Sequence, residues 1–250
     1  MEPGRAVPDT TAVSSLARTT MGEQLSLLIL TRIVSGELPP GSTLPSEAEL
    51  ADTYQVSRPV VRETIRHLAA YGVVRIQHGK RTRILSPDHW DVLSLTVQEA
   101  YERAGRGRGL RLQVYEVRLI LEGSAAALAA ARATAEQCDQ IDLLIREMGE
   151  RVASQSSVTE FLTNNYLFHD TIAHASGNLP LRQLVRQTHG FLNASGTASR
   201  FKAEGVGEAA AQHRRISEAV LAGDKDEARK AAEYHVTWAQ SIEEGSDPEN

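Results

Sequence analysis

Cysteine is nearly absent from this chain: Cys138 is the only one among 250 residues, so no internal disulfide can form. This absence excludes a cysteine-ligated zinc site and is typical of a reducing compartment. Long hydrophobic runs are also missing, since no apolar stretch approaches the roughly 18 residues of a membrane span. The first residues lack the basic and then apolar order of a signal peptide. We therefore expect a cytoplasmic protein with no membrane partner, in which any metal is bound by histidine and oxygen ligands.

The formal net charge of −5 taken over the whole chain disfavours a nucleic-acid partner, but the charge is unevenly distributed along the sequence. Residues 55–85 hold seven basic side chains and one acid, Glu63, and so carry +6, which leaves −11 for the remainder. The seven are Arg58, Arg62, Arg66, Arg75, Lys80, Arg81 and Arg83. Such a concentration attracts phosphate. We expect this segment to contact nucleic acid.

The segment before Ser57 has the pattern of two helices. Residues 1–19 show no apolar periodicity and are expected to form a flexible leader. Apolar residues at helical spacing predict a first helix from about Thr20 to Ser35. The stretch 46–49, Ser-Glu-Ala-Glu, has the form of a capping box and predicts a second helix that runs to about Tyr54.

A third helix is predicted after Ser57, a natural N-cap, and should end near Gly72. Its apolar residues share one face, whereas Arg58, Arg62 and Arg66 recur every fourth residue and therefore share another. One face is thus suited to a core and the other to a charged partner.

Two alternating stretches, 73–77 and 81–85, follow this helix and predict a β-hairpin with its tip at 78–80. Three helices followed by a hairpin are the elements of a winged helix-turn-helix. We expect this domain to occupy residues 20–86.

The remainder of the chain lacks strand-like alternation and is predicted to be helical throughout. We expect a mainly α protein in which an antiparallel all-α bundle of six or seven helices follows the winged domain. A linker helix and loop are expected over 87–109, the bundle over 110–244, and a disordered tail over 245–250. The expected breaks are Gly105–Gly109, Ala133–Thr134, Ser154–Ser157, Gly177–Pro180, Gly205–Gly207 and Gly223–Asp224.

Several stretches resemble a known family of regulators. The runs Gly41–Ala51 and Val56–Glu63 resemble the signature of GntR-family transcription regulators, and Ile76–Lys80 is similar to the wing of the FadR subfamily. The second half is similar to the FCD ligand-binding domain of that subfamily, on the stretches Glu116–Glu122, Ala125–Thr134, Phe168–His169 and Ser176–Asn178. The resemblance covers about residues 20–243.

The resemblance implies that the third helix enters the major groove of DNA and that the wing approaches the minor groove. The DNA-contacting residues it implies are Ser57, Arg58, Pro59, Val60, Arg62, His78, Gly79 and Lys80. An arginine fork can pair with guanine, and Ser57 at the helix N-terminus can hold phosphate. At Ala48 relatives often carry Arg, so one contact is missing or moved. The family implies a homodimer that reads a short pseudo-palindromic operator in double-stranded DNA.

Relatives hold a divalent metal with one Asp and three His, which implies a metal site here at His169, His213 and His235. Asn165, one helical turn before His169, stands where relatives commonly have Asp. Because an amide oxygen is neutral, we expect weaker metal binding than with a carboxylate. Zinc is favoured, with nickel and manganese as alternatives. We expect the other histidines to be ordinary core or surface residues: His67, His89, His174 and His189.

The predicted function is that of a regulator, most simply a repressor, which releases DNA when a small carboxylate effector binds the bundle. Arg118 is the candidate for a second contact with the effector carboxylate. The alternative role for Arg118 is a surface ion pair with Glu122. A metal-free acyl-CoA sensor of the same fold is a second hypothesis. A metal-dependent hydrolase is a third, but Asp170 should point about 100° away from His169, and no placed general base is evident, so we expect no enzyme.

Overall fold

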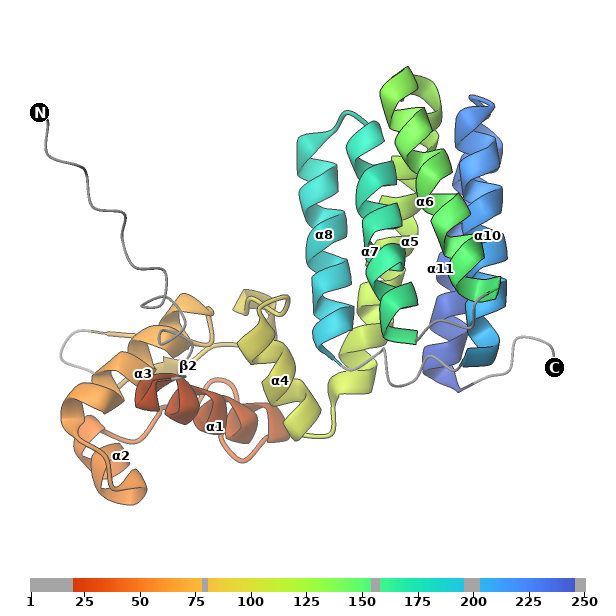
Figure 1. Cartoon of the computed structure of the whole chain (residues 1–250). Helices are drawn as coiled ribbons and strands as arrows, with labels where there is room; N and C mark the ends of the chain where they lie inside the picture. The colour runs from red at the N-terminus through yellow and green to blue at the C-terminus, as the bar shows by residue number, and fades with distance from the viewer. Residues whose placement is uncertain (1–19, 78–80, 154–157, 196–202, 246–250) are drawn as a thin grey trace, which may run out of the picture. The chain divides into compact units, whose positions relative to one another are not determined.

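The computed structural model describes residues 20–77, 81–153, 158–195 and 203–245 (Figure 1). Our predictions for the leader at 1–19, for the break at 154–157 and for all but the first residue of the tail at 245–250 concern residues outside this part of the chain. The same holds for the three predicted wing-tip contacts, which are His78, Gly79 and Lys80. The chain divides after Val92 into two compact units.

The N-terminal unit begins with helix α1 (Met21–Ser35). Thr20 and Glu23 form a capping box, since the side chain of each accepts a hydrogen bond from the backbone amide of the other. The helix ends at Gly36, whose φ of 94° is a left-handed conformation that glycine adopts at low cost. Helix α1 packs against helix α3 (Arg58–Ala70) through buried aliphatic side chains, which include Leu25, Ile29, Ile33, Val61, Ile65 and Leu68.

Helix α2 (Glu47–Tyr54) starts with the predicted capping box, formed by Ser46 and Glu49. Gln55 ends it with a φ of 53°. Ser57 is the N-cap residue of α3, as predicted, but its side chain makes no capping hydrogen bond.

The hairpin consists of β1 (Val74–Arg75) and β2 (Arg83–Ile84), which pair antiparallel with Val74 opposite Ile84. These strands are shorter than the predicted ones. Together with α1, α2 and α3 they confirm the winged helix-turn-helix. The short 3₁₀ helix η2 (Pro87–His89) follows the hairpin.

The C-terminal unit is helical in the part of the chain that the structure describes. Its helices are α4 (Leu95–Arg103), α5 (Gly107–Arg132), α6 (Ala135–Ala153), α7 (Val158–Ala175), α8 (Leu179–Ala194), α10 (Ala203–Leu221) and α11 (Lys225–Glu244). The long helix α5 packs against α7, α8, α10 and α11 (Figure 1). Helix α4 contacts α5 and α8. This arrangement confirms the predicted all-α bundle. No helix within the described ranges is long and apolar enough to cross a membrane.

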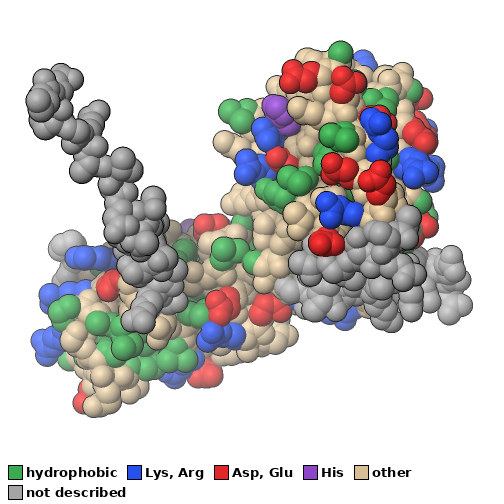
Figure 2. Space-filling model, in the orientation of Figure 1, with side chains coloured by type: hydrophobic (Ala, Val, Ile, Leu, Met, Phe, Trp, Pro, Cys, Tyr) green, Lys and Arg blue, Asp and Glu red, His purple; other side chains and the backbone are tan. Residues whose placement is uncertain are grey.

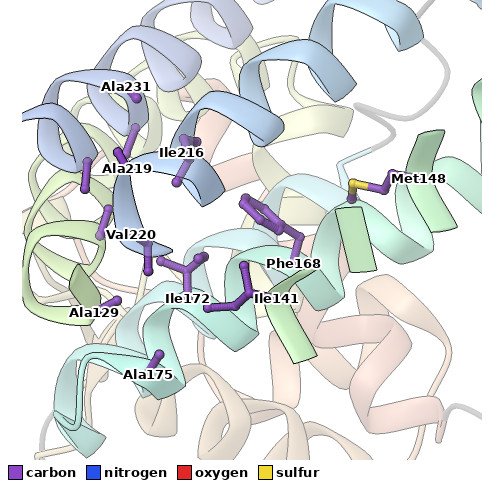
Figure 3. Close-up of a cluster of buried hydrophobic side chains, with 13 residues drawn as sticks. Ala129, Ile141, Met148, Phe168, Ile172, Ala175, Ile216, Ala219, Val220 and Ala231 are labelled. Carbon is purple, nitrogen blue, oxygen red and sulfur yellow. The ribbon is translucent and has the colours of Figure 1, made fainter. Parts of the chain in front are cut away.

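The core of this unit is a cluster of apolar side chains from α5, α6, α7, α10 and α11 (Figure 3). Phe168 and Ile172 from α7 meet Ile141 and Met148 from α6 and Ile216 from α10. Full burial of such a side chain contributes about 1.5–3 kcal/mol. Because Phe168 is fully buried, it also fixes the position of the next residue of α7, which is His169.

One predicted break is wrong, because residues 205–207 lie inside α10. The predicted break at Gly105–Gly109 exists but is shorter, since α4 ends at Arg103 and α5 begins at Gly107. A glycine costs a helix about 1 kcal/mol, but burial of an apolar face outweighs that local preference. Helix α10 has such a face, which carries Ala209 and Ile216.

Candidate functional site

The solvent-exposed face of α3 carries the predicted DNA contacts. Ser57, Arg58 and Pro59 are exposed at its N-terminal end, Val60 is partly buried, and Arg62 is exposed one turn further on. The apolar face of α3 is buried. Figure 2 shows blue basic side chains on this unit. An exposed arginine pair at the start of a helix is suited to the major groove.

Arg62 has an intramolecular partner that the sequence did not reveal. Its Nε lies 2.8 Å from Oε2 of Glu47 at the start of α2. The side chains are 60% and 42% exposed. An ion pair this exposed contributes about 0–1 kcal/mol, so Arg62 can exchange Glu47 for a base edge or a phosphate at little cost.

In the C-terminal unit three buried histidines from different helices meet. His169 lies on α7, His213 on α10 and His235 on α11. The Nε2 atom of His213 lies 3.2 Å from the Nε2 atom of His169 and 3.2 Å from that of His235. Tetrahedral zinc, with Zn–N bonds of 2.0–2.1 Å, places its nitrogen ligands about 3.3 Å apart. The spacing therefore fits a divalent metal.

Oxygen acceptors orient two of these rings. The Nδ1 atom of His169 lies 2.7 Å from Oε2 of Glu122, and Nδ1 of His235 lies 2.9 Å from Oε1 of Gln212. A proton on Nδ1 directs the Nε2 lone pair toward the centre of the cluster, the arrangement found around metal-ligating histidines. Nδ1 of His213 has no partner among the described atoms.

Glu122 on α5 connects the histidines to two further side chains. Its Oε1 lies 2.5 Å from Nε of Arg118 and 3.0 Å from Nε2 of His189 on α8. Burial raises the pKa of the Glu122 carboxyl, but the positive charge of Arg118, together with the adjacent imidazoles, outweighs that effect and holds the pKa well below its usual range. The predicted ion pair of Arg118 and Glu122 exists, but it is buried and does not lie on the surface.

Burial also determines the charge of the imidazoles. It lowers the pKa of His189 to about 3, assisted by the positive charge of Arg118. Burial and the neighbouring imidazoles hold the pKa values of His213 and His235 well below their usual range. Neutral imidazole is the form that binds metals.

We expected His189 to be an ordinary core or surface residue, but its ring contacts Glu122 in this cluster. Together with Glu122 and His169, it forms a second group of three potential ligands. Its contact with Glu122 joins positions 67 residues apart through the packing of α5 against α8. A short motif carries no such signal.

A pocket opens beside the histidines, and its enclosed volume is about 50 Å³. Arg118, Asn165, His189 and His235 contribute to its wall, and so does Trp238. It therefore combines a buried cation, potential metal ligands and apolar surface.

Asp170, the residue considered as a general base, does not serve this cluster. Its Oδ2 lies 2.7 Å from Arg182, which lowers the pKa of its carboxyl. Asp170 is therefore paired with Arg182 and not with His169.

A winged helix-turn-helix with an exposed basic helix, joined to a bundle with a buried polar pocket, defines a two-domain DNA-binding regulator. Residues 21–84 match the family described as bacterial regulatory proteins, gntR family, and residues 113–237 match the FCD domain. The chain belongs to the GntR family, in its FadR-like subfamily with a C-terminal FCD domain.

The relatives found are transcription regulators. The regulator LutR of Bacillus subtilis is 29% identical over 87% of this chain and 99% of its own. The galactonate operon transcriptional repressor of Escherichia coli K12 is 29% identical over 61% of this chain and 66% of its own. A solved structure, that of Lar, which controls the Listeria monocytogenes agr system, aligns with 92% of this chain and 99% of Lar, with a TM-score of 0.61. The two sequences are 19% identical, so this likeness shows the fold alone. These regulators agree with our expectation that the chain is not an enzyme and imply a DNA operator.

Proposed function

We propose that this regulator represses transcription in the cytoplasm and releases its operator when a small carboxylate binds at a metal site in the FCD domain. The observation that carries the proposal is the convergence of three buried Nε2 atoms beside a pocket lined by Arg118. The chain acts as a homodimer on a short pseudo-palindrome, because two linked DNA-binding domains provide the affinity for DNA that one small domain lacks.

The donor set fits a divalent metal. His169, His213 and His235 supply neutral nitrogens, and Asn165 on the pocket wall is the candidate for a further oxygen donor. Imidazole nitrogens suit zinc, which we take as the first candidate, with nickel or manganese as alternatives. The ion would supply a positive charge and a position for an anionic oxygen.

Arg118 provides a second attraction for that anion. Only its Nε contacts Glu122, and its terminal nitrogens have no hydrogen-bond partner among the described residues. Arg118 lines the pocket, and the fork of a guanidinium matches carboxylate geometry. The relative named for a galactonate operon points to the same ligand chemistry, because galactonate is a carboxylate.

The metal-free acyl-CoA sensor is the second candidate. An acyl chain gains nothing from three converging imidazole nitrogens and a buried guanidinium. This donor set favours the small acid.

The linker helix α4 provides a path from this pocket to the DNA-binding unit. Nε2 of Gln98 donates to the backbone oxygen of Phe191 on α8, and Glu102 pairs with Arg111 on α5. Arg111 also pairs with Glu243, which lines the pocket. A ligand that moves these walls moves α4, and it shifts DNA affinity by its differential affinity for the two states.

Calorimetry on metal-loaded and chelated protein tests the proposal, with lactate, pyruvate, citrate and gluconate as ligands. We expect at least one acid to bind the loaded protein, to lose most of its affinity after chelation, and to release operator DNA selected from a random pool. An effector that is uncharged, or that binds equally well after chelation, would overturn the metal-anchored carboxylate.

Asn165→Asp should tighten metal binding, because a carboxylate attracts a divalent cation more strongly than an amide does. We expect the dissociation constant for zinc, measured by competition with a chromophoric chelator, to fall by about tenfold or more. Asn193→Asp is the matched control, since Asn193 lines the same pocket from α8. An unchanged or larger constant for Asn165→Asp would place residue 165 outside the coordination shell.

A further inference from the structure

One buried carboxylate, that of Glu122, contacts both the candidate anion-binding residue and a candidate metal ligand. Its Oε1 accepts a hydrogen bond from Nε of Arg118 at 2.5 Å and lies 3.0 Å from Nε2 of His189. Its Oε2 lies 2.7 Å from Nδ1 of His169 and has no other partner among the described residues. The side chains of Arg118 and Glu122 are 6% and 5% exposed, so water screens their charges weakly. Arg118 and His169 therefore share one negative charge.

Arg118 and His169 compete for this charge. An imidazole that coordinates a metal through Nε2 gains basicity when a carboxylate accepts the proton on its Nδ1. The guanidinium of Arg118 beside the same carboxylate offsets that negative charge as His169 experiences it. The acceptor at His235 is different, because its Nδ1 lies 2.9 Å from the neutral amide oxygen of Gln212. Any influence of Arg118 on the metal ligands should therefore pass through His169.

We propose that Glu122 couples anion binding to metal binding: an anion that pairs with Arg118 leaves more of the Glu122 charge to His169 and so tightens the metal site. Glu122 is then a positioning residue that acts through His169. By thermodynamic linkage, metal binding strengthens anion binding by the same factor. The coupling does not require the anion to span the pocket. The inference rests on the proposed function and adds a coupling mechanism to it.

Zinc alone tests this coupling, because Arg118→Gln removes the competing charge that a bound anion would neutralise. We expect the dissociation constant for zinc to fall by about fivefold or more in this variant. The constant is measured on the untagged full-length protein by competition with a chromophoric chelator at one fixed pH. A purely structural role for the buried ion pair predicts the opposite result, since a disturbed α5 would weaken the site.

Arg182→Gln is the matched control. It removes the same charge from an ion pair with Asp170, the residue that follows His169 in α7, but Arg182 has no contact with Glu122 among those that the structure describes. Its dissociation constant for zinc should match that of the wild type. A fall equal to that in Arg118→Gln would show a general effect of net charge and would overturn the coupling through Glu122.

Glu122→Gln in the Arg118→Gln background shows whether Glu122 transmits the effect. The double variant replaces both members of the ion pair with amides, so neither charge is left buried without the other. Because His169 then has no carboxylate at Nδ1, we expect zinc binding about tenfold weaker than in the wild type. A double variant that binds zinc as tightly as Arg118→Gln would show that Arg118 acts by direct repulsion of the ion, and would overturn the role of Glu122.

The outcomes separate this inference from the proposed function. An unchanged or weaker zinc affinity in Arg118→Gln would overturn the coupling and leave the metal-anchored carboxylate standing. If Arg118→Gln does not fold, the double variant still decides, because an affinity equal to or above that of the wild type contradicts the role of Glu122. Failure of the wild-type protein to bind zinc, nickel or manganese would overturn the proposed function and this inference together.

Discussion

His213→Ala should abolish stoichiometric binding of zinc to the purified, untagged protein. His213 is the central residue of the cluster, since its Nε2 lies 3.2 Å from the Nε2 atoms of both other histidines. Without it two nitrogens and a neutral amide remain, which are too few donors for a buried divalent ion. Metal analysis after dialysis should find about one ion per wild-type chain and essentially none in the variant.

The same change should remove the stabilisation that the metal gives. An ion at a thousandfold excess over its dissociation constant stabilises the native state by about 4 kcal/mol, which raises the melting temperature of a protein of this size by roughly 10 °C. Added zinc should produce that rise in the wild type and none in His213→Ala. Comparing each protein with and without metal separates this effect from the cavity that the substitution leaves.

His174→Ala provides the control, because His174 is an exposed histidine of α7, the same helix that carries His169. Its zinc content and its melting shift should match those of the wild type. A His213→Ala protein that retains one tightly bound ion would show that the metal uses the other group, formed by Glu122, His169 and His189.

The helix boundaries that could be predicted depend on neighbours in the sequence. The capping box of Ser46 and Glu49 is local, and so is the turn at Gly223, where Asp224 caps α11. The interior of α10 could not be predicted in this way. Residues 205–207 contain two glycines and suggest a break, yet the helix continues because its apolar face packs against the rest of the unit.

The residues of the site also fall into two groups: those that the sequence indicates and those that only the packing of helices brings together. The family resemblance identified His169, His213 and His235, and the structure brings these three side chains together. The ion pair of Arg118 and Glu122 follows from their spacing of four residues, but its burial depends on how α7 and α8 cover α5. The contacts of Glu122 with His169 and His189 arise from this packing, and no pattern along the chain could reveal them.

Arg58→Ala should abolish most of the discrimination between the cognate operator and a scrambled site. Arg58 is exposed at the N-terminal end of α3, where a recognition helix contacts base edges. A bidentate arginine–guanine pair discriminates by about 1–3 kcal/mol, and a dimer loses two such pairs. We expect the ratio of the two dissociation constants to fall by about a hundredfold or more in fluorescence anisotropy titrations at fixed salt.

Arg66→Ala is the matched comparison, because Arg66 is exposed on the same face of α3 but two turns further from its start. A phosphate contact there would weaken binding to both DNA sites equally and reduce the salt dependence of the affinity by about one ion per subunit. The two variants thus separate base reading from charge: Arg58→Ala should change the ratio, and Arg66→Ala should change the affinity alone. If Arg58→Ala keeps the wild-type ratio while Arg66→Ala loses it, base reading is centred further along α3 and our assignment of the DNA contacts is wrong.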